Sequence, residues 1–175
     1  RLLIVGLAPG MHGANATGRP FTGDYAGVLL YQTLFDFGFA SQPEATSIDD
    51  GLELFDCRIT NAVRCLPPEN KPVGAEINQC NDYLAEDLAQ VSSEGVVVAL
   101  GGIAHRAVLK AQGLKLSAIP FVHGAEARLP NSAWLISSYH CSRYNTQTGR
   151  LTRAMFLKVM RRAAFIAYDR NHSLS

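Results

Sequence analysis

The stretch from Gly6 to Asp24 combines glycines with two side chains that could act on a planar ligand. Phe21 stands in a polar loop, where a large ring needs an apolar partner, and a nucleobase would provide one by stacking. Asp24 directly precedes a predicted helix, so its carboxylate could take part in chemistry or simply cap the helix. The glycines also suit a phosphate group, because they free backbone N–H groups to face an anion. These residues alone leave a base site and a phosphate site open.

Two further polar side chains lie within or directly after predicted strands. Asn61 lies in the strand expected at residues 57–63, and its amide could pair with the O4 and N3–H edge of uracil. The alternative is an asparagine that only forms a turn. His140 follows the strand expected at residues 134–139 and could stabilise negative charge on a leaving group. A purely structural histidine is the alternative, and the remaining histidines show no metal-ligand spacing.

Strands and helices alternate along the chain, a pattern typical of a parallel sheet covered by helices on both faces. The apolar run Leu2–Leu7 indicates a buried strand, and the apolar spacing of residues 25–37 predicts a helix. Further strands are expected at 57–63, 96–100, 119–122 and 134–139, and helices at 74–91, 103–112 and 152–168, the last capped by Thr152. Functional groups in such sheets gather at the carboxyl ends of the strands. The loops expected there are 8–24, 61–71, 101–105 and 140–150.

The composition predicts one globular domain over residues 1–175, with no apolar run long enough to span a membrane. The net charge is only +1, so binding to nucleic acid would require local clusters of cations. Arg143, Arg150 and Arg153 form one such cluster in or beside a polar loop, where phosphate contact is expected. Lys158, Arg161 and Arg162 form a second cluster, which we interpret as a solvated helix face.

Three long segments together resemble one protein family. GLAPGMHGANATGRPFTGD, ITNAVRCLPPENKP and YHCSRYNTQTGRLT are similar to the three signature stretches of the family 5 uracil-DNA glycosylases, the iron–sulfur branch of their superfamily. The resemblance extends from Leu2 to about Ala164 and includes the segment His123–Ala127. It implies a three-layer α/β/α fold with a central, mainly parallel four-stranded sheet.

The resemblance also assigns roles to individual residues. Neighbouring branches place an acidic residue or asparagine directly after Gly6, where this chain has Leu7, so Asp24 is the best acidic candidate. Phe21 resembles the ring that stacks on the extruded base, Asn61 the base-reading amide, and His140 the histidine near the pyrimidine O2. The remaining assignments are Gly6, Ala8 and Asn145 as base-binding residues, and Arg143, Tyr144 and Arg150 as DNA-binding residues.

The resemblance implies a 4Fe-4S cluster bound by four cysteines. Cys65 and Cys80, separated by fourteen residues, match the second pair of ligands. The first pair would precede Arg1, so we expect an N-terminal segment that is missing from this sequence; loss of the cluster is the alternative. Cys57 and Cys141 match no ligand position.

The expected function is excision of uracil, and of hypoxanthine or other deaminated or adducted bases, from double- or single-stranded DNA. No lysine in the three segments stands where a Schiff base would form, which indicates a monofunctional glycosylase. We expect a monomer in the prokaryotic cytoplasm, associated with the nucleoid and not with a membrane. The alternatives are a catalytically silent lesion-binding or iron–sulfur structural module, and a hydrolase of free nucleosides or nucleotides. The arginine-rich loop favours polymeric DNA.

Overall fold

A single five-stranded sheet forms the centre of the molecule in the computed structural model, which describes residues 1–8, 19–63 and 74–168. The strands lie in the order β2-β1-β3-β5-β4. Four of them run parallel, namely β1 (Leu2–Gly6), β2 (Cys57–Asn61), β3 (Val96–Leu100) and β5 (Trp134–Ser138). The short edge strand β4 (Glu126–Arg128) pairs antiparallel with β5.

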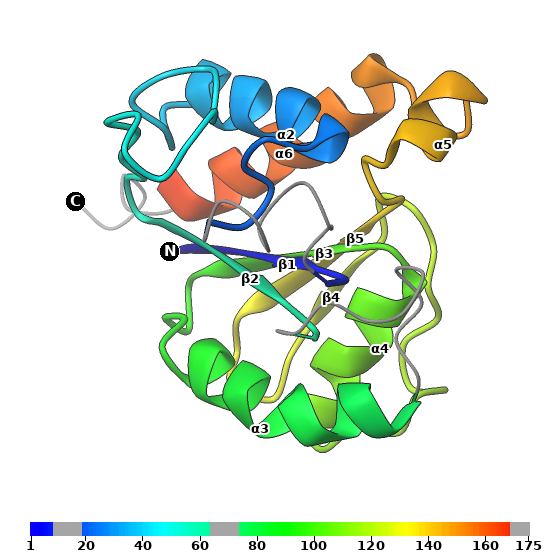
Figure 1. Cartoon of the computed structure of the whole chain (residues 1–175). Helices are drawn as coiled ribbons and strands as arrows, with labels where there is room; N and C mark the ends of the chain where they lie inside the picture. The colour runs from blue at the N-terminus through cyan, green and yellow to red at the C-terminus, as the bar shows by residue number, and fades with distance from the viewer. Residues whose placement is uncertain (9–18, 64–73, 169–175) are drawn as a thin grey trace.

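Helices cover both faces of this sheet (Figure 1). Helices α2 (Tyr25–Asp36) and α6 (Arg153–Tyr168) lie on one face, and α3 (Gly74–Ala89) and α4 (Gly102–Ala111) lie on the other. A short helix, α5 (Arg143–Gln147), follows β5. The predicted three-layer α/β/α fold is confirmed, with a fifth, antiparallel strand added to the expected four.

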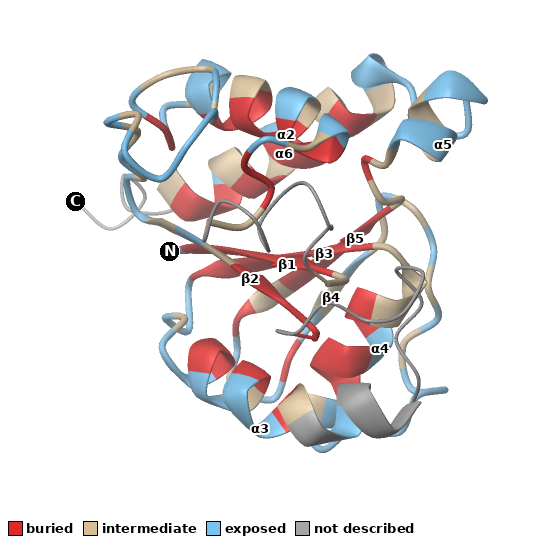
Figure 2. Ribbon diagram, in the orientation of Figure 1, coloured by how far each residue is buried: buried red, intermediate tan, exposed pale blue. Residues whose placement is uncertain are grey.

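Side-chain alternation in the central strands explains the two layers of core. Leu2 and Ile4 of β1 pack with the helices α2 and α6, whereas Leu3 and Val5 pack with α3 and α4. The four side chains are at most 2% exposed, and Figure 2 shows the central strands β1 and β3 buried between helices whose outer faces are exposed. Such continuous apolar runs are required where both faces of a parallel sheet are covered.

The prediction of a strand at residues 119–122 is wrong. Residues 119–122 form no strand, and the edge strand lies instead at Glu126–Arg128. A buried side chain holds the 119–122 segment in place, because the His105 ring pairs with the Ile119 carbonyl at 2.7 Å. A three-residue, largely exposed edge strand has no apolar run to mark it in a sequence.

The 140–150 segment also differs from the loop that was expected, because it contains helix α5. The Ser142 hydroxyl caps this helix by accepting from the Asn145 N–H at 3.3 Å. The predicted capping role of Thr152 is confirmed, since its hydroxyl accepts from the Met155 N–H at 3.2 Å.

None of the helices in the described part of the chain combines the length and the apolar character that a membrane span requires.

Candidate functional site

The parallel register brings the predicted site residues to one edge of the sheet. Gly6 at the end of β1 pairs with Asn61 at the end of β2, and Leu100 at the end of β3 pairs with Ser138 at the end of β5. His140 follows two residues after Ser138. Because parallel strands all finish on the same side, residues distant in sequence meet there.

A cavity of about 450 Å³ opens at this edge. Its walls are mostly apolar, and a few polar groups converge on it, which is the usual construction of a small-molecule site. The lining residues are Leu7, Ala8, Phe21, Asp24, Ala26, Leu100, Gly101, Gly102, Ile103, His140, Ser142 and Arg143. The cavity therefore brings together five of the residues proposed from the sequence, namely Ala8, Phe21, Asp24, His140 and Arg143.

Gly6 and Asn61 are not among the lining residues, but both lie next to Phe21, which is. A Cβ atom on Gly6 would stand 2.5 Å from the Asn61 Oδ1 and 2.6 Å from the Phe21 ring, so only glycine fits at this position. Asn61 is 8% exposed, and its Oδ1 has no hydrogen-bond partner among the described residues. A buried acceptor without a partner is costly, which points to a ligand donor that would satisfy it.

Phe21 occupies the left-handed backbone region, with φ of 58°. Residues other than glycine adopt this region rarely, because it costs conformational free energy. Its ring is 6% exposed and lies 5.9 Å from the His140 ring, tilted by 36°. The Phe21 ring therefore lies close to both the His140 ring and the Gly6–Asn61 pair.

Asp24 caps α2 and also lines the cavity. Its Oδ1 accepts from the Gly27 N–H at 2.8 Å, so the structural interpretation of this residue is correct. The same carboxylate is half-buried at the cavity wall, and burial raises its pKa above the ordinary value, an effect that the Gly27 hydrogen bond partly opposes. Capping therefore orients the carboxylate without removing it from the site.

His140 is half-buried in the cavity, and burial lowers the pKa of its imidazole to about 4. The ring is consequently neutral at physiological pH and can donate one hydrogen bond without carrying a charge. Asn145 lies outside the cavity lining and donates from Nδ2 to the His140 carbonyl at 2.9 Å. This contact makes Asn145 a support for the histidine loop in the structure.

The arginines divide into two groups. Arg143 lies 5.4 Å from the Tyr25 ring centroid and Arg150 lies 4.9 Å from that of Tyr139, both with their guanidinium over the ring. Tyr144, between them in sequence, is 71% exposed. Two other arginines from the predicted clusters form ion pairs, Arg153 with Asp36 at 3.6 Å and Arg162 with Glu126 at 2.7 Å.

Sequence reasoning missed the support of the Phe21 loop. Asp50, in the connection between the helix α2 and the strand β2, forms an ion pair with Arg19 at 2.7 Å. The two residues are separated by about thirty positions, and neither lies in a periodic pattern. The glycine pair after β3 was a usable signal, since Gly101 and Gly102 both line the cavity.

The expected cluster ligands are only partly within the described structure. Cys80 is half-buried on α3, and Cys65 lies outside the described residues. Among residues 1–8, 19–63 and 74–168, no group of three or more His, Cys, Asp or Glu side chains could hold a metal ion. A 4Fe-4S cluster needs four ligands, so the described residues do not by themselves fit one.

Comparison with known proteins agrees with this architecture. The family model of the uracil DNA glycosylase superfamily matches residues 1–164. A type-5 uracil-DNA glycosylase from Thermus thermophilus is 50% identical over 167 residues, which cover 95% of this chain and 76% of that protein. The type-5 enzyme from Pyrobaculum aerophilum is 45% identical, over 94% of this chain and 71% of its own length. A type-4 enzyme from Archaeoglobus fulgidus is 32% identical over 70% of this chain and 54% of its own length. The chain therefore belongs to the uracil DNA glycosylase superfamily, among its type-5 members.

Proposed function

We propose that this protein removes uracil from DNA by hydrolysing the N-glycosidic bond and leaving an abasic site. The observation that carries the proposal is the cavity at the carboxyl edge of the sheet, where an aromatic wall, a carboxylate and a neutral imidazole converge. A base within a duplex is inaccessible, so the enzyme would extrude it at a cost of a few kcal/mol. The apolar cavity would accept the extruded base.

Recognition of the base would rest on Phe21 and Asn61. The Phe21 ring would stack on the face of the base, and the Asn61 amide would pair with its edge. The unpartnered Asn61 Oδ1 supports this role, because a uracil N3–H would supply the missing donor.

His140 would stabilise the departing base. As the C1′–N1 bond breaks, its electron pair leaves with uracil, and the sugar becomes oxocarbenium-like. A neutral imidazole would donate to the developing oxyanion of the base, a contact typically worth about 3 kcal/mol. The low pKa supports donation from a neutral ring.

Asp24 would act on the sugar side. Its carboxylate would orient a water molecule, favour the cationic sugar and accept the proton released as water adds to C1′. The Gly27 hydrogen bond holds one carboxylate oxygen and leaves the other for water. Leu7 lines the cavity at the position where neighbouring branches of the superfamily carry a polar group. Its apolar side chain cannot activate water.

Substrate range would extend beyond uracil. With about 450 Å³ and largely apolar walls, the cavity has room for bases larger than a pyrimidine. We therefore propose hypoxanthine and other deaminated or adducted bases as further substrates. Because Leu7 adds no catalytic group, bases that depart easily would react fastest.

Arg143, Tyr144 and Arg150 would contact the DNA around the extruded nucleotide, in a single- or double-stranded substrate. Arg143 reaches from α5 into the cavity lining, and Tyr144 is highly exposed. We further propose that the protein acts as a monomer. Its place of action would be the nucleoid of the prokaryotic cytoplasm.

Cys65 and Cys80 remain the proposed ligands for half of a 4Fe-4S cluster, which would have a structural role. The similarity of their positions to the second ligand pair of the family supports this proposal, as does the partial exposure of Cys80. Iron analysis and visible absorption of the protein purified without oxygen test it. A cluster predicts about four iron atoms per chain, and Cys80→Ser should reduce that content.

The decisive assay for the function uses duplex oligonucleotides containing U·G, U·A, hypoxanthine·T or ethenocytosine·G, with abasic products cleaved by alkali. The proposal predicts abasic sites on the uracil substrates. If the protein binds the duplexes but forms abasic product on none of the four, the silent lesion-binding module would be favoured. Activity on free nucleosides alone would favour the nucleoside hydrolase.

A further inference from the structure

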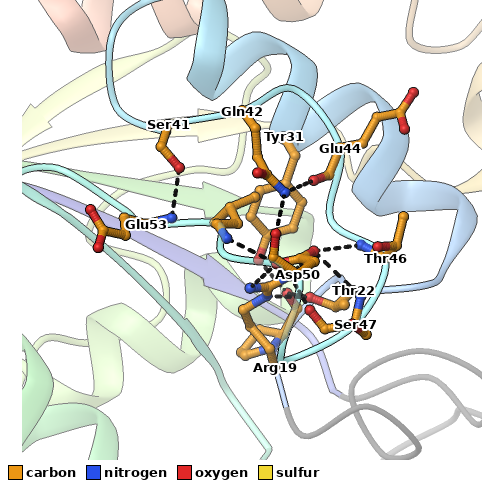
Figure 3. Close-up of polar contacts among 12 residues, drawn as sticks. Arg19, Thr22, Tyr31, Ser41, Gln42, Glu44, Thr46, Ser47, Asp50 and Glu53 are labelled. Atoms are coloured by element: carbon orange, nitrogen blue, oxygen red, sulfur yellow. Dashed lines mark hydrogen bonds and ion pairs between the residues drawn. The ribbon is translucent and has the colours of Figure 1, made fainter.

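The turn that carries Phe21 is held at both neighbouring residues. The Tyr31 hydroxyl donates to the Pro20 carbonyl at 2.7 Å, and the Arg19 Nε donates to the Thr22 Oγ1 at 2.7 Å. Figure 3 shows Arg19, Thr22 and Tyr31 meeting at this turn. Because Phe21 occupies a disfavoured backbone region, its conformation persists only if its surroundings impose it.

Arg19 connects this turn to a second segment through Asp50. Its guanidinium donates to both carboxylate oxygens, from Nη1 at 3.1 Å and from Nη2 at 2.7 Å. The two side chains are only 15% and 8% exposed. A paired, two-contact geometry of this kind fixes direction as well as distance.

Asp50 is itself held by its own loop. Its carboxylate accepts the backbone N–H of Thr46 at 2.8 Å and that of Leu52 at 3.0 Å. Arg19 adds a bond from Nη2 to the Ser47 carbonyl at 2.9 Å. The 46–52 loop therefore fixes the position of the Arg19 guanidinium through Asp50 and the Ser47 carbonyl (Figure 3).

We propose that Arg19 and Asp50 are positioning residues that set the Phe21 ring in the base-stacking wall. Neither residue is among those that line the cavity, and Arg19 contacts the Phe21 turn at Thr22 and pairs with Asp50, so we expect any effect on excision to pass through that turn. The proposal rests on the proposed function, since it assigns Phe21 the stacking role. The competing interpretation is an ion pair that stabilises the fold and has no influence on the site.

A double-mutant comparison separates these interpretations. Asp50→Asn keeps the size of the side chain and removes its charge, and Phe21→Leu removes the ring. Single-turnover excision of uracil from a U·G duplex should slow about tenfold in Asp50→Asn. In the Phe21→Leu background, the same substitution should change the rate less than about twofold. Equal losses in both backgrounds would overturn the proposal, as would an unchanged rate in folded Asp50→Asn.

Glu126→Gln supplies the matched control, because it disrupts another two-contact pair, with Arg162, at 2.7 and 3.0 Å. This variant should lose stability and keep its excision rate. If Asp50→Asn folds poorly, Arg19→Lys retains the positive charge but loses the paired geometry. Arg19→Lys should lower the excision rate when Phe21 is present and should not lower it in the Phe21→Leu background. A fall of equal size in both backgrounds would contradict the proposal.

A readout without catalysis distinguishes failure of this inference from failure of the proposed function. Fluorine NMR of 4-fluorophenylalanine-labelled protein, assigned with Phe21→Leu, reports the environment of the ring in the absence of DNA. Asp50→Asn should shift or split the Phe21 signal, and Glu126→Gln should leave it unchanged. A wild-type protein that excises no base contradicts the proposed function, whereas an unchanged Phe21 signal in Asp50→Asn overturns the positioning role.

Discussion

At the residue scale, burial controls the chemistry available to His140. The imidazole stands at the cavity wall, where desolvation disfavours its charged form and lowers its pKa to about 4. A neutral ring is the form suited to donate to a departing anion without being titrated near physiological pH. The apolar surroundings of the imidazole therefore set its protonation state.

His140 should titrate far below a free imidazole. In a pH series monitored by NMR, its ring signals should show a midpoint near 4, not at the ordinary 6.5. Since the unfolded chain takes up the proton first, the free energy of unfolding should fall as the pH drops from about 6.5 towards 4. His140→Gln should remove this part of the pH dependence. A midpoint at or above 6.5 would contradict the account.

Gly6 should tolerate no side chain. In Gly6→Ala the new Cβ would displace the Asn61 Oδ1 or the Phe21 ring, since both lie within 2.6 Å of its position. We expect single-turnover excision to fall by at least about tenfold, equivalent to about 1.4 kcal/mol. Gly113→Ala is the control, because it strains a positive φ of 69° in open space far from the cavity. Equal excision rates in the two variants would disprove the packing argument.

At the element scale, the sheet and its main helices follow from hydrophobic patterns, whereas the precise walls of the site do not. The runs at residues 2–6 and 96–100 are apolar enough to predict buried strands directly. Asn61 and His140 were predicted to share an edge because parallel strands end together. The positive φ of Phe21 and the Arg19–Asp50 pair depend on tertiary contacts that no local pattern records. The strand β4 and the helix α5 are too short to show a period.

Helix α2 contains a glycine, Gly27, whose replacement by alanine should destabilise the protein, in contrast to the usual effect of this substitution in helices. Alanine normally stabilises a helix by about 1 kcal/mol relative to glycine. At Gly27, however, the added Cβ would overlap the Phe21 carbonyl oxygen, only 1.7 Å away. Gly27→Ala should therefore lower the free energy of unfolding by about 1–3 kcal/mol in urea denaturation.

Gly102→Ala in α4 is the comparison for this substitution. Its new Cβ would meet the flexible Arg106 side chain at 3.2 Å, which can move aside. We expect Gly102→Ala to be neutral or stabilising. A stabilised Gly27→Ala protein would show that α2 and the Phe21 turn are not packed as described.

At the scale of the whole molecule, DNA binding must come from the distribution of charge, because the net charge is only +1. The arginines near the cavity differ in their partners. Arg143 stacks on Tyr25 and lines the cavity, whereas Arg162 is paired with Glu126. Affinity should therefore depend on the first and not on the second.

The salt dependence of binding tests this distinction. Arg143→Ala should weaken binding to duplex DNA and reduce the slope of log K against log salt by about one. Arg162→Ala should leave the slope unchanged, since its partner already neutralises it. Equal slopes for the wild type and Arg143→Ala would exclude a phosphate contact by Arg143.

The central claim, that the carboxylate of Asp24 drives base excision in this cavity, is tested most directly by one single-turnover measurement. Asp24→Asn keeps a side chain able to cap α2, so the helix should remain intact. On a U·G duplex, the rate of abasic-site formation should fall by about 100-fold or more, while affinity for the duplex is retained. An unchanged rate in Asp24→Asn would contradict the account.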